Sequence, residues 1–345
     1  MITLCFNFLL LAYTSVFFVL TRKTMKGSVT GLLGLLFVIT LMSVGLSPDG
    51  LGAVALMAWG VFLHVPLFLL TFSVLASRAH KHRALMALLI ALLILTLCAD
   101  AFLIEPHWLE VAHVTLTSEK LDRSIRVAVL ADIQTDAPGE YDARVFARVK
   151  AEKPDLILFL GDYIQTTADK FAPCAKKLNT LLHDADFNPP LGQYAIRGNK
   201  DHDTWTDIFS DLNVTCLDQT TTTDIGPMIL TGLSFAQSFQ TNVTLEPQEK
   251  FHLVLGHGPD YALGQTHADL MLAGHTHGGQ VRIPGLGPLL TYSKVPRAWA
   301  SGLTQITPNQ HLYVSRGIGM ERGHAPRLRF LCRPELLIMT LAPAP

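Results

Sequence analysis

The sequence predicts two unlike parts, an all-α transmembrane bundle followed by an α/β domain of layered strands and helices. The composition is too apolar for an ordinary soluble protein, because 49% of the 345 residues are hydrophobic, 16% are charged and the mean hydropathy is +0.33. The excess hydrophobicity lies in the first hundred residues, and short β-rich runs alternate with helical patterns after Ser124. We therefore expect a transmembrane region at 1–104, a juxtamembrane linker at 105–123 and a second domain at 124–345.

Four apolar runs near the N-terminus are each long enough, at roughly 20 residues, to cross the hydrocarbon core of a bilayer as a helix. They cover residues 2–20, 29–46, 54–75 and 84–104. A cleaved signal peptide is the alternative for the first run, but that run has no basic segment and no small-residue cleavage site, and three more runs follow it. The pattern favours four membrane-spanning helices.

The charges of the connecting loops predict the orientation of these helices. The loops after the first and third runs are basic, with Arg22, Lys23 and Lys26 in one and Arg78, Lys81 and Arg83 in the other. Because short basic loops stay in the cytoplasm, both loops are expected there. An even number of spans then places the second domain on the opposite face. We expect a multi-pass protein of the cytoplasmic (inner) membrane whose second domain is extracytoplasmic.

The charge balance argues against a nucleic-acid partner. Residues 1–104 carry six Lys or Arg against Asp49 and Asp100, a net charge of +4, so the remainder carries −5 to reach the total of −1. A mildly acidic domain is not attracted to phosphate backbones. The bilayer itself is the expected macromolecular partner.

The second domain contains eight short β-rich runs with helical patterns between the early ones. The runs cover residues 125–131, 155–160, 193–197, 228–233, 251–255, 269–273, 311–315 and 336–341. A helix is expected at 141–154, where Val145, Phe146 and Val149 share one face. Proline and glycine gather at 283–288 and 316–326, which indicates two extended surface loops.

Five of these runs are followed by a polar residue, and four of the five residues come directly after a glycine. The residues are Asp132, Asp162, Asn199, His257 and His275. Each alone is an ordinary turn or helix-capping residue, but ligands of α/β sheets gather at the carboxyl ends of strands, where these side chains can converge. Carboxylates, an amide oxygen and neutral imidazoles suit a pair of divalent ions such as Mn²⁺, Fe²⁺ or Zn²⁺.

The motifs at these positions resemble, in order, those of the calcineurin-like metallophosphoesterase superfamily. They read "DIQ" at 132–134, "GD" at 161–162, "GNKD" at 198–201, "GH" at 256–257 and "GHTH" at 274–277. "AGHTHGGQVRIPGLGPL", "LYVSRGIG" and "RFLCRPELLIMTL" are similar to the membrane-associated bacterial branch of this superfamily. The resemblance spans residues 124–343 and implies a four-layer-type β-sandwich flanked by helices, the calcineurin-like phosphoesterase fold.

The resemblance also implies a dinuclear metal centre. One ion would be held by Asp132, Asp162 and His277, and the other by Asp162, Asn199, His257 and His275, so that Asp162 bridges the two. A water held between the ions, with its pKa lowered toward neutrality, would attack phosphorus in line. The expected ions are Mn²⁺ first, with Fe²⁺, Zn²⁺ and Mg²⁺ as alternatives.

Gln134 departs from the family pattern, since the superfamily usually has histidine at this place of its Asp-x-His motif. A glutamine carbonyl oxygen binds hard cations but is a weaker donor than imidazole for softer ions. We expect Gln134 to be a metal ligand in a looser site that leans toward Mn²⁺ or Mg²⁺. Asp136, two residues on, is a candidate to compensate by approaching the same ion.

Lys200 is the second departure, because the family motif "GNHD" has at this place a histidine thought to protonate the leaving group. A lysine, with an ordinary pKa near 10.4, is better suited to hold phosphate by its charge than to cycle a proton at neutral pH. His202 is the other candidate acid, and Asp201 is expected to orient either one. Lys200, Asp201 and His202 are therefore the predicted catalytic residues. One or two of the late arginines, Arg316, Arg322, Arg327 and Arg329, are further candidates to bind phosphate.

The expected function is hydrolysis of a phosphate mono- or diester at the outer face of a membrane. If the substrate is membrane-bound, the tether limits it to a lipid, a lipid-linked sugar or an envelope polymer. One alternative is cleavage of the diphosphate of a nucleotide-linked lipid precursor, which needs a cytoplasmic active site. Another is a non-catalytic sensor of metal or phosphate, with Gln134 and Lys200 as marks of lost chemistry. Transport by the bundle is disfavoured because the apolar runs carry few polar groups beyond hydroxyl residues and Asp100, which lies near the end of a run where it can reach water.

Overall fold

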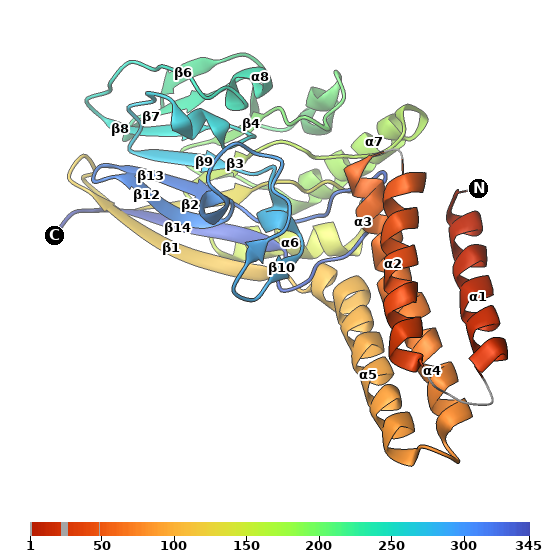
Figure 1. Ribbon diagram of the computed structural model, residues 1–345. Helices are drawn as coiled ribbons and strands as arrows, with labels where there is room; N and C mark the ends of the chain where they lie inside the picture. The colour runs from red at the N-terminus through yellow and green to blue at the C-terminus, as the bar shows by residue number, and fades with distance from the viewer. Residues whose placement is uncertain (1, 22–26, 48) are drawn as a thin grey trace. The chain divides into compact units, whose positions relative to one another are not determined.

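The computed structural model describes residues 2–21, 27–47 and 49–345, and its chain divides into two compact units (Figure 1). The helical unit consists of Met1–Ile104 and Arg322–Arg327, and the sandwich unit consists of Glu105–Glu321 and Leu328–Pro345. Each unit has its own apolar core.

The helical unit confirms the four long apolar helices that the sequence predicts. Over the described residues, four segments are long and apolar enough to cross a membrane: Ile2–Thr21, Ser28–Leu46, Gly50–Ala76 and Lys81–His107. They contain helices α1 (Ile2–Thr21), α2 (Ser28–Leu46), α3 (Gly50–Trp59), α4 (Val65–Ala76) and α5 (Lys81–Ala99). Arg22, Lys23 and Lys26, on which part of the orientation argument rests, lie outside the described residues.

The third span is interrupted where its sequence places a proline. Pro66 stands in the first turn of α4 and has no N–H to continue the helical hydrogen bonds, and the five residues Gly60–His64 before it form a π-turn. His64 is buried at this turn, and its Nε2 lies 2.7 Å from Oδ1 of Asn7 on α1. The π-turn thus provides a polar link between two apolar helices.

The sandwich unit contains, over the described part of the chain, two six-stranded sheets and a short hairpin. The first sheet has the order β1 (Glu110–Ser118), β14 (Glu335–Pro343), β2 (Ile125–Leu130), β3 (Leu156–Phe159), β4 (Gln193–Ile196), β5 (Thr215–Leu217). The second has the order β12 (Gly302–Thr307), β13 (Gln310–Val314), β9 (Leu270–Ala273), β8 (Phe251–Leu255), β7 (Met228–Gly232), β6 (Thr221–Asp224). The hairpin pairs β10 (Arg282–Ile283) with β11 (Gly287–Pro288), within the first of the two expected loops.

The two sheets pack face to face through the apolar side chains of their inner faces. Val127, Val129 and Leu158 of the first sheet belong to one cluster with Leu253 and Leu272 of the second. The outer face of the first sheet is covered by α6 (Glu140–Ala151) and α7 (Ala168–Ala185), and that of the second by the short helical turn Asp260–Leu263 and neighbouring loops. The layered β-sandwich flanked by helices is therefore confirmed.

Strand β1 lies within the stretch that we expected to be a linker. Its sequence "EVAHVTLTS" alternates polar and apolar residues, and it pairs in parallel with β14 along its full length, from Glu110 with Glu335 to Ser118 with Pro343. Residues 110–118 are therefore part of the first sheet, where they form its edge.

Candidate metal centre

The predicted ligands follow strands that run in the same direction within each sheet. Strands β2, β3 and β4 are parallel neighbours, and Asp132, Asp162 and Asn199 come soon after their carboxyl ends. Strands β8 and β9 are parallel neighbours in the other sheet, and they are followed by His257 and His275. The carboxylates and the amide thus come from one sheet and the imidazoles from the other.

The structure brings one half of the predicted ligand set into direct proximity. Asp162, His257 and His275 each offer a ligand atom within 4.8 Å of the others. Nε2 of His257 lies 3.3 Å from Oδ2 of Asp162 and 3.0 Å from Oδ1 of Asn199. These four residues are the set that the resemblance assigns to one ion.

The other half of the set lies beside the first. Nε2 of His277 is 3.9 Å from Oδ1 of Asp132, and both side chains are buried. The carboxylate of Asp132 also accepts a hydrogen bond from the main-chain N–H of His275, with a distance of 2.9 Å from N to Oδ1. Asp132 is therefore connected to both halves of the candidate centre.

The backbone at these residues is strained. Of the seven predicted ligands, all of which the structure describes, five have a positive φ, namely Asp132 at 49°, Gln134 at 39°, Asp162 at 55°, His275 at 67° and His277 at 48°. Such conformations cost of order 1–3 kcal/mol each for residues with a side chain, and they cluster at functional sites. The strained turns aim the side chains at a common point.

The glycines of the motifs leave room for the carboxylates. A Cβ atom at Gly198 would lie 2.2 Å from Oδ1 of Asp162, and a Cβ atom at Gly274 would lie 2.5 Å from Oδ2 of Asp132. Both distances are far below a van der Waals contact. Gly198 and Gly274 are therefore required by the space that the side chains of Asp162 and Asp132 occupy.

The electrostatics of the site set two kinds of histidine apart. Burial lowers the pKa of His275 to about 4 and that of His277 well below its ordinary value, so both imidazoles are neutral at pH 7. Burial also lowers the pKa of His257, but the charge of Asp162 outweighs it and raises that pKa to about 9. For Asp162, burial raises the pKa, and the charge and hydrogen bond of His257 bring it below its ordinary value.

These residues fit a pair of divalent cations. Burial raises the pKa of Asp132 to about 7, against the charge of His257, which lowers it, and with that of Asp162, which raises it. Within residues 2–21, 27–47 and 49–345, neither ring nitrogen of the buried His277 has a hydrogen-bond partner. Buried polar atoms are normally paired. Neutral imidazoles beside buried carboxylates therefore supply lone pairs and negative charge where a metal ion can use both.

Gln134 is buried, and the contacts of its side chain fix the orientation of its amide. Its Nε2 donates to Oε1 of Gln165 at 2.8 Å and to Oε2 of Glu321 at 3.1 Å. Asp136 lies in the bend before α6, where its main-chain oxygen accepts a hydrogen bond from the Cys174 thiol. Sequence reasoning had not identified Gln165 or Glu321, which are distant from Gln134 in the chain.

The three predicted catalytic residues line a common cavity of about 350 Å³, together with Ile164 and Phe171. The main-chain N–H of Lys200 donates to Oδ1 of Asp162 at 2.7 Å, and its Nζ pairs with Oε1 of Glu321 at 3.1 Å. The ring of His202 stacks on Phe171, with centroids 4.8 Å apart. One wall residue of the cavity, Lys200, is therefore hydrogen-bonded to the candidate ligand Asp162, which does not itself line the cavity.

The contacts of the Asp201 carboxylate are with main-chain groups. Its buried carboxylate accepts hydrogen bonds from the main-chain N–H groups of Asp162, Tyr163 and Gly198, at 2.7 to 2.8 Å. Burial and the nearby Asp162 raise its pKa to about 7. These contacts position the backbone that carries Asp162, whereas the expectation was that Asp201 orients Lys200 or His202.

Two of the late arginines are committed to protein contacts. Arg329 is buried and donates to main-chain oxygens of Arg316, Gly317, Gly319 and Cys332. Arg316 pairs with Glu335 and with Glu110. Their guanidinium groups hold the loop after β13 in place, so the expectation that they bind phosphate does not apply to these two.

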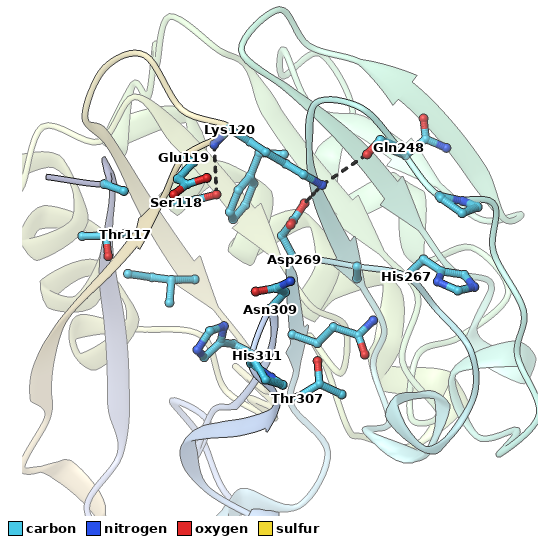
Figure 2. Close-up of a pocket in the computed structure, with 17 residues that line it drawn as sticks. Thr117, Ser118, Glu119, Lys120, Gln248, His267, Asp269, Thr307, Asn309 and His311 are labelled. Atoms are coloured by element: carbon cyan, nitrogen blue, oxygen red, sulfur yellow. Dashed lines mark hydrogen bonds and ion pairs between the residues drawn. The ribbon is translucent and has the colours of Figure 1, made fainter.

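A larger cavity, of about 620 Å³, lies at the other ends of the strands (Figure 2). It is lined by residues at the starts of β8 and β13 and at the end of β1. Lys120 reaches across it, and its Nζ bonds to Oδ2 of Asp269 at 2.9 Å and to the main-chain oxygen of Gln248 at 3.2 Å. The predicted site residues, all of which are described, do not line this cavity.

Known proteins are similar to this chain over the sandwich unit. Residues 125–279 match the family model of the calcineurin-like phosphoesterases. The chain is 30% identical over 265 residues to an uncharacterized metallophosphoesterase of Bacillus subtilis (strain 168), covering 69% of this chain and 87% of that protein. It is 28% identical over 255 residues to the phosphodiesterase YaeI of Escherichia coli (strain K12), covering 69% and 90%.

A third relative has a narrower printed activity. The chain is 23% identical over 282 residues to the UDP-2,3-diacylglucosamine pyrophosphatase LpxG of Chlamydia muridarum, covering 62% of this chain and 83% of that protein.

Proposed function

The chain belongs to the calcineurin-like phosphoesterase family, whose members are hydrolases, and on that premise we propose that it is a membrane-anchored phosphoesterase with two divalent cations. It hydrolyses a phosphate mono- or diester. The observation that carries this proposal is the meeting of Asp162, Asn199, His257 and His275 at one point, beside Asp132 and His277.

In this proposal the ligands divide as follows. Asp132, Gln134, Asp162 and His277 hold one cation, and Asp162, Asn199, His257 and His275 hold the other. When bound, such a pair supplies Lewis acidity toward phosphoryl oxygens and lowers the pKa of water toward neutrality. Mn²⁺ is the expected ion, because the set is rich in oxygen ligands and one position has glutamine in place of imidazole.

The protein prepares its imidazoles for this task. Nδ1 of His257 lies 2.8 Å from the main-chain oxygen of Leu160, to which it donates, so the ring nitrogen that faces Asp162 and Asn199 is Nε2, whose proton a metal ion would displace. Such an outer contact fixes the tautomer and the ring orientation of a ligand. The low pKa values of His275 and His277 keep their rings unprotonated at neutral pH.

Lys200 and the adjoining cavity receive the substrate in this proposal. The side chain of Lys200 is 29% exposed and lies on the wall of the cavity, where its ammonium group can bind a phosphate oxygen by its charge. The stacked rings of His202 and Phe171 offer a flat apolar wall for the rest of the substrate. His202 is the candidate to donate a proton to the leaving group, because an imidazole, unlike the lysine ammonium, readily both donates and accepts protons in catalysis.

The four apolar helices support membrane anchoring, and the basic loops support an extracytoplasmic sandwich unit. A phosphoester carried by a lipid or by an envelope polymer is then the substrate class within reach. The second candidate is diphosphate hydrolysis of a nucleotide-linked lipid precursor, which the similarity to the Chlamydia muridarum pyrophosphatase favours. A reporter fused to the C-terminus separates the two, because a cytoplasmic C-terminus supports the second and an external one the first.

The test of the activity uses the full chain in detergent micelles, loaded with Mn²⁺ and assayed with bis(4-nitrophenyl) phosphate and 4-nitrophenyl phosphate. We expect turnover that EDTA abolishes and Mn²⁺ restores, and that His257→Asn removes. His311→Asn, in the distant cavity, is the matched control and should retain activity. Metal binding without hydrolysis of either ester would support the non-catalytic sensor.

A further inference from the structure

The two departures from the family pattern meet at one carboxylate. Oε2 of Glu321 lies 3.1 Å from Nε2 of Gln134, and Oε1 of Glu321 lies 3.1 Å from Nζ of Lys200. Gln134 and Lys200 stand at the two places where the family has histidine, and they are 66 positions apart in the chain. A shared partner indicates that the two substitutions belong to one arrangement.

The hydrogen bonds of this arrangement define which way each amide points. A carboxylate only accepts, so Nε2 of Gln165 must be the atom that lies 2.7 Å from Oε1 of Glu321. Oε1 of Gln165 is then the acceptor for Nε2 of Gln134, at 2.8 Å. Both N–H groups of Gln134 are thus directed to Gln165 and Glu321, and its carbonyl oxygen points the other way.

The carboxylate of Glu321 is itself held in place. Its side chain is 18% exposed, and its main-chain N–H donates to Oε1 of Gln280 at 2.9 Å. Gln280 follows the turn of the candidate ligand His277. Two residues before Glu321, the main-chain oxygen of Gly319 accepts a hydrogen bond from Arg329. The loop that carries Glu321 is therefore anchored to the same turn that carries a ligand.

We propose that Glu321 is a positioning residue. Together with Gln165, it turns the carbonyl oxygen of Gln134 toward the metal position shared with Asp132 and His277. This proposal rests on the metal centre of the proposed function. A carbonyl oxygen held in this way is a hard ligand, so the arrangement favours Mn²⁺ or Mg²⁺ over Zn²⁺ at that position. The same carboxylate fixes Lys200 beside the centre, where a histidine would otherwise stand.

The variant Glu321→Gln tests this role. It replaces one carboxylate oxygen, which accepts, with an NH₂ group, which donates, although Gln134, Gln165 and Lys200 all donate to this side chain. The amide of Gln134 is then free to turn its N–H groups toward the metal position. We expect the Mn²⁺ affinity of the metal position that includes Gln134 to fall by about 10–100-fold, the usual effect of removing a residue that orients a metal ligand. Isothermal titration and elemental analysis of the full chain in detergent measure this without any assay of activity.

The matched control is Glu152→Gln. It makes the same change at a carboxylate outside the candidate centre. Glu152 stands at the C-terminal end of α6, where it pairs with Arg148. Its Mn²⁺ affinity and stoichiometry should equal those of the wild type. A loss in both variants would assign the effect to net charge and would overturn the proposal.

A second background separates positioning from a general structural effect. In Gln134→His an imidazole presents a ring nitrogen to the metal with no amide to orient, so adding Glu321→Gln should cost little further Mn²⁺ affinity. Gln134→His alone should also shift the preference toward Zn²⁺. Equal losses from Glu321→Gln in the two backgrounds, or no loss in either, would contradict the proposal.

Folding is checked by thermal unfolding in EDTA, where every variant should match the wild type. If Glu321→Gln fails this check, Gln165→Met replaces it, since it removes the acceptor for Gln134 and leaves the charge of Glu321. Gln165→Met should cause the same loss of Mn²⁺ affinity in the chain with Gln134, and little loss when it is combined with Gln134→His. A wild type that binds two ions without turnover refutes the proposed hydrolase but not this inference, whereas a wild type that binds no metal refutes both.

Discussion

The two ends of the sandwich carry polar cavities that differ in how their groups are satisfied. In the larger cavity, at the distal end, the ammonium group of Lys120 is bound to Asp269, and Asp269 also accepts from the main-chain N–H of His252. At the other end lie strained turns, neutral buried imidazoles and carboxylates with raised pKa values. The smaller cavity is the functional candidate because the buried imidazoles and carboxylates beside it need a cation as a further partner. The volumes of the two cavities would have favoured the other one.

The largest difference between the two ends should appear on removing one carboxylate from each. Asp162→Asn deletes the charge shared by both proposed ions and should lower the hydrolysis rate by more than about 100-fold, beyond the range for outer contacts. Asp269→Asn is the matched change in the distal cavity and should leave the rate unaltered. Steady-state kinetics with bis(4-nitrophenyl) phosphate compare them, and similar losses in the two variants would remove the distinction.

The space required by the ligands gives the next effect. Gly198→Ala adds a Cβ that would lie 2.2 Å from Oδ1 of Asp162, so the ligand must move and metal affinity should fall by about 10–100-fold. Gly139→Ala is the control, because its Cβ would meet an ordinary contact of 3.7 Å. Unchanged Mn²⁺ affinity in Gly198→Ala would show that Asp162 does not act from this position.

A smaller effect is expected from the charge that binds substrate. Lys200→Ala should raise KM by about tenfold, the equivalent of one charge-assisted hydrogen bond of about 1.5 kcal/mol, with a lesser change in kcat. Lys120→Ala, which removes the ammonium group of the distal cavity, should change neither constant. If Lys200→Ala lowers kcat and leaves KM unchanged, Lys200 acts in the chemical step and our assignment of a binding role is wrong.

The smallest effect concerns stability at the distal end. Because Lys120 is partly exposed, Asp269→Asn should lower the free energy of unfolding by no more than about 1 kcal/mol. Thermal unfolding with and without EDTA measures this. The shift should be the same in both conditions, since the distal cavity is independent of the metal ions, and a shift that depends on EDTA would contradict that independence.

Sequence reasoning identified the strands that carry the candidate ligands because those strands are buried on both faces. An apolar run such as "VAVLA" ending in Asp132, or "LMLAG" ending in His275, is visible without knowledge of the fold. The edge strands were missed. Strand β6, with the sequence "TTTD", and strand β1 have exposed or half-exposed faces and weak hydrophobic patterns.

The contacts around Gln134 could not be predicted in the same way. Glu321 lies in a glycine- and proline-rich loop 187 positions later, and only the fold brings its carboxylate to the amide. Arg329 was one of four arginines considered as candidates to bind phosphate, whereas its donors satisfy main-chain oxygens of the same loop. A local pattern identifies which residue types are present, but long-range hydrogen bonds decide which of their atoms remain available to a ligand.

The most direct test of the dinuclear centre is a Mn²⁺ titration of the full chain followed by electron paramagnetic resonance. Two ions held about 3.5–4 Å apart by a shared Asp162 should bind with a stoichiometry of two and give the spectrum of an exchange-coupled pair. In Asp162→Asn that coupled spectrum should be lost. A single uncoupled ion in the wild type, or no bound Mn²⁺ at all, would contradict the account.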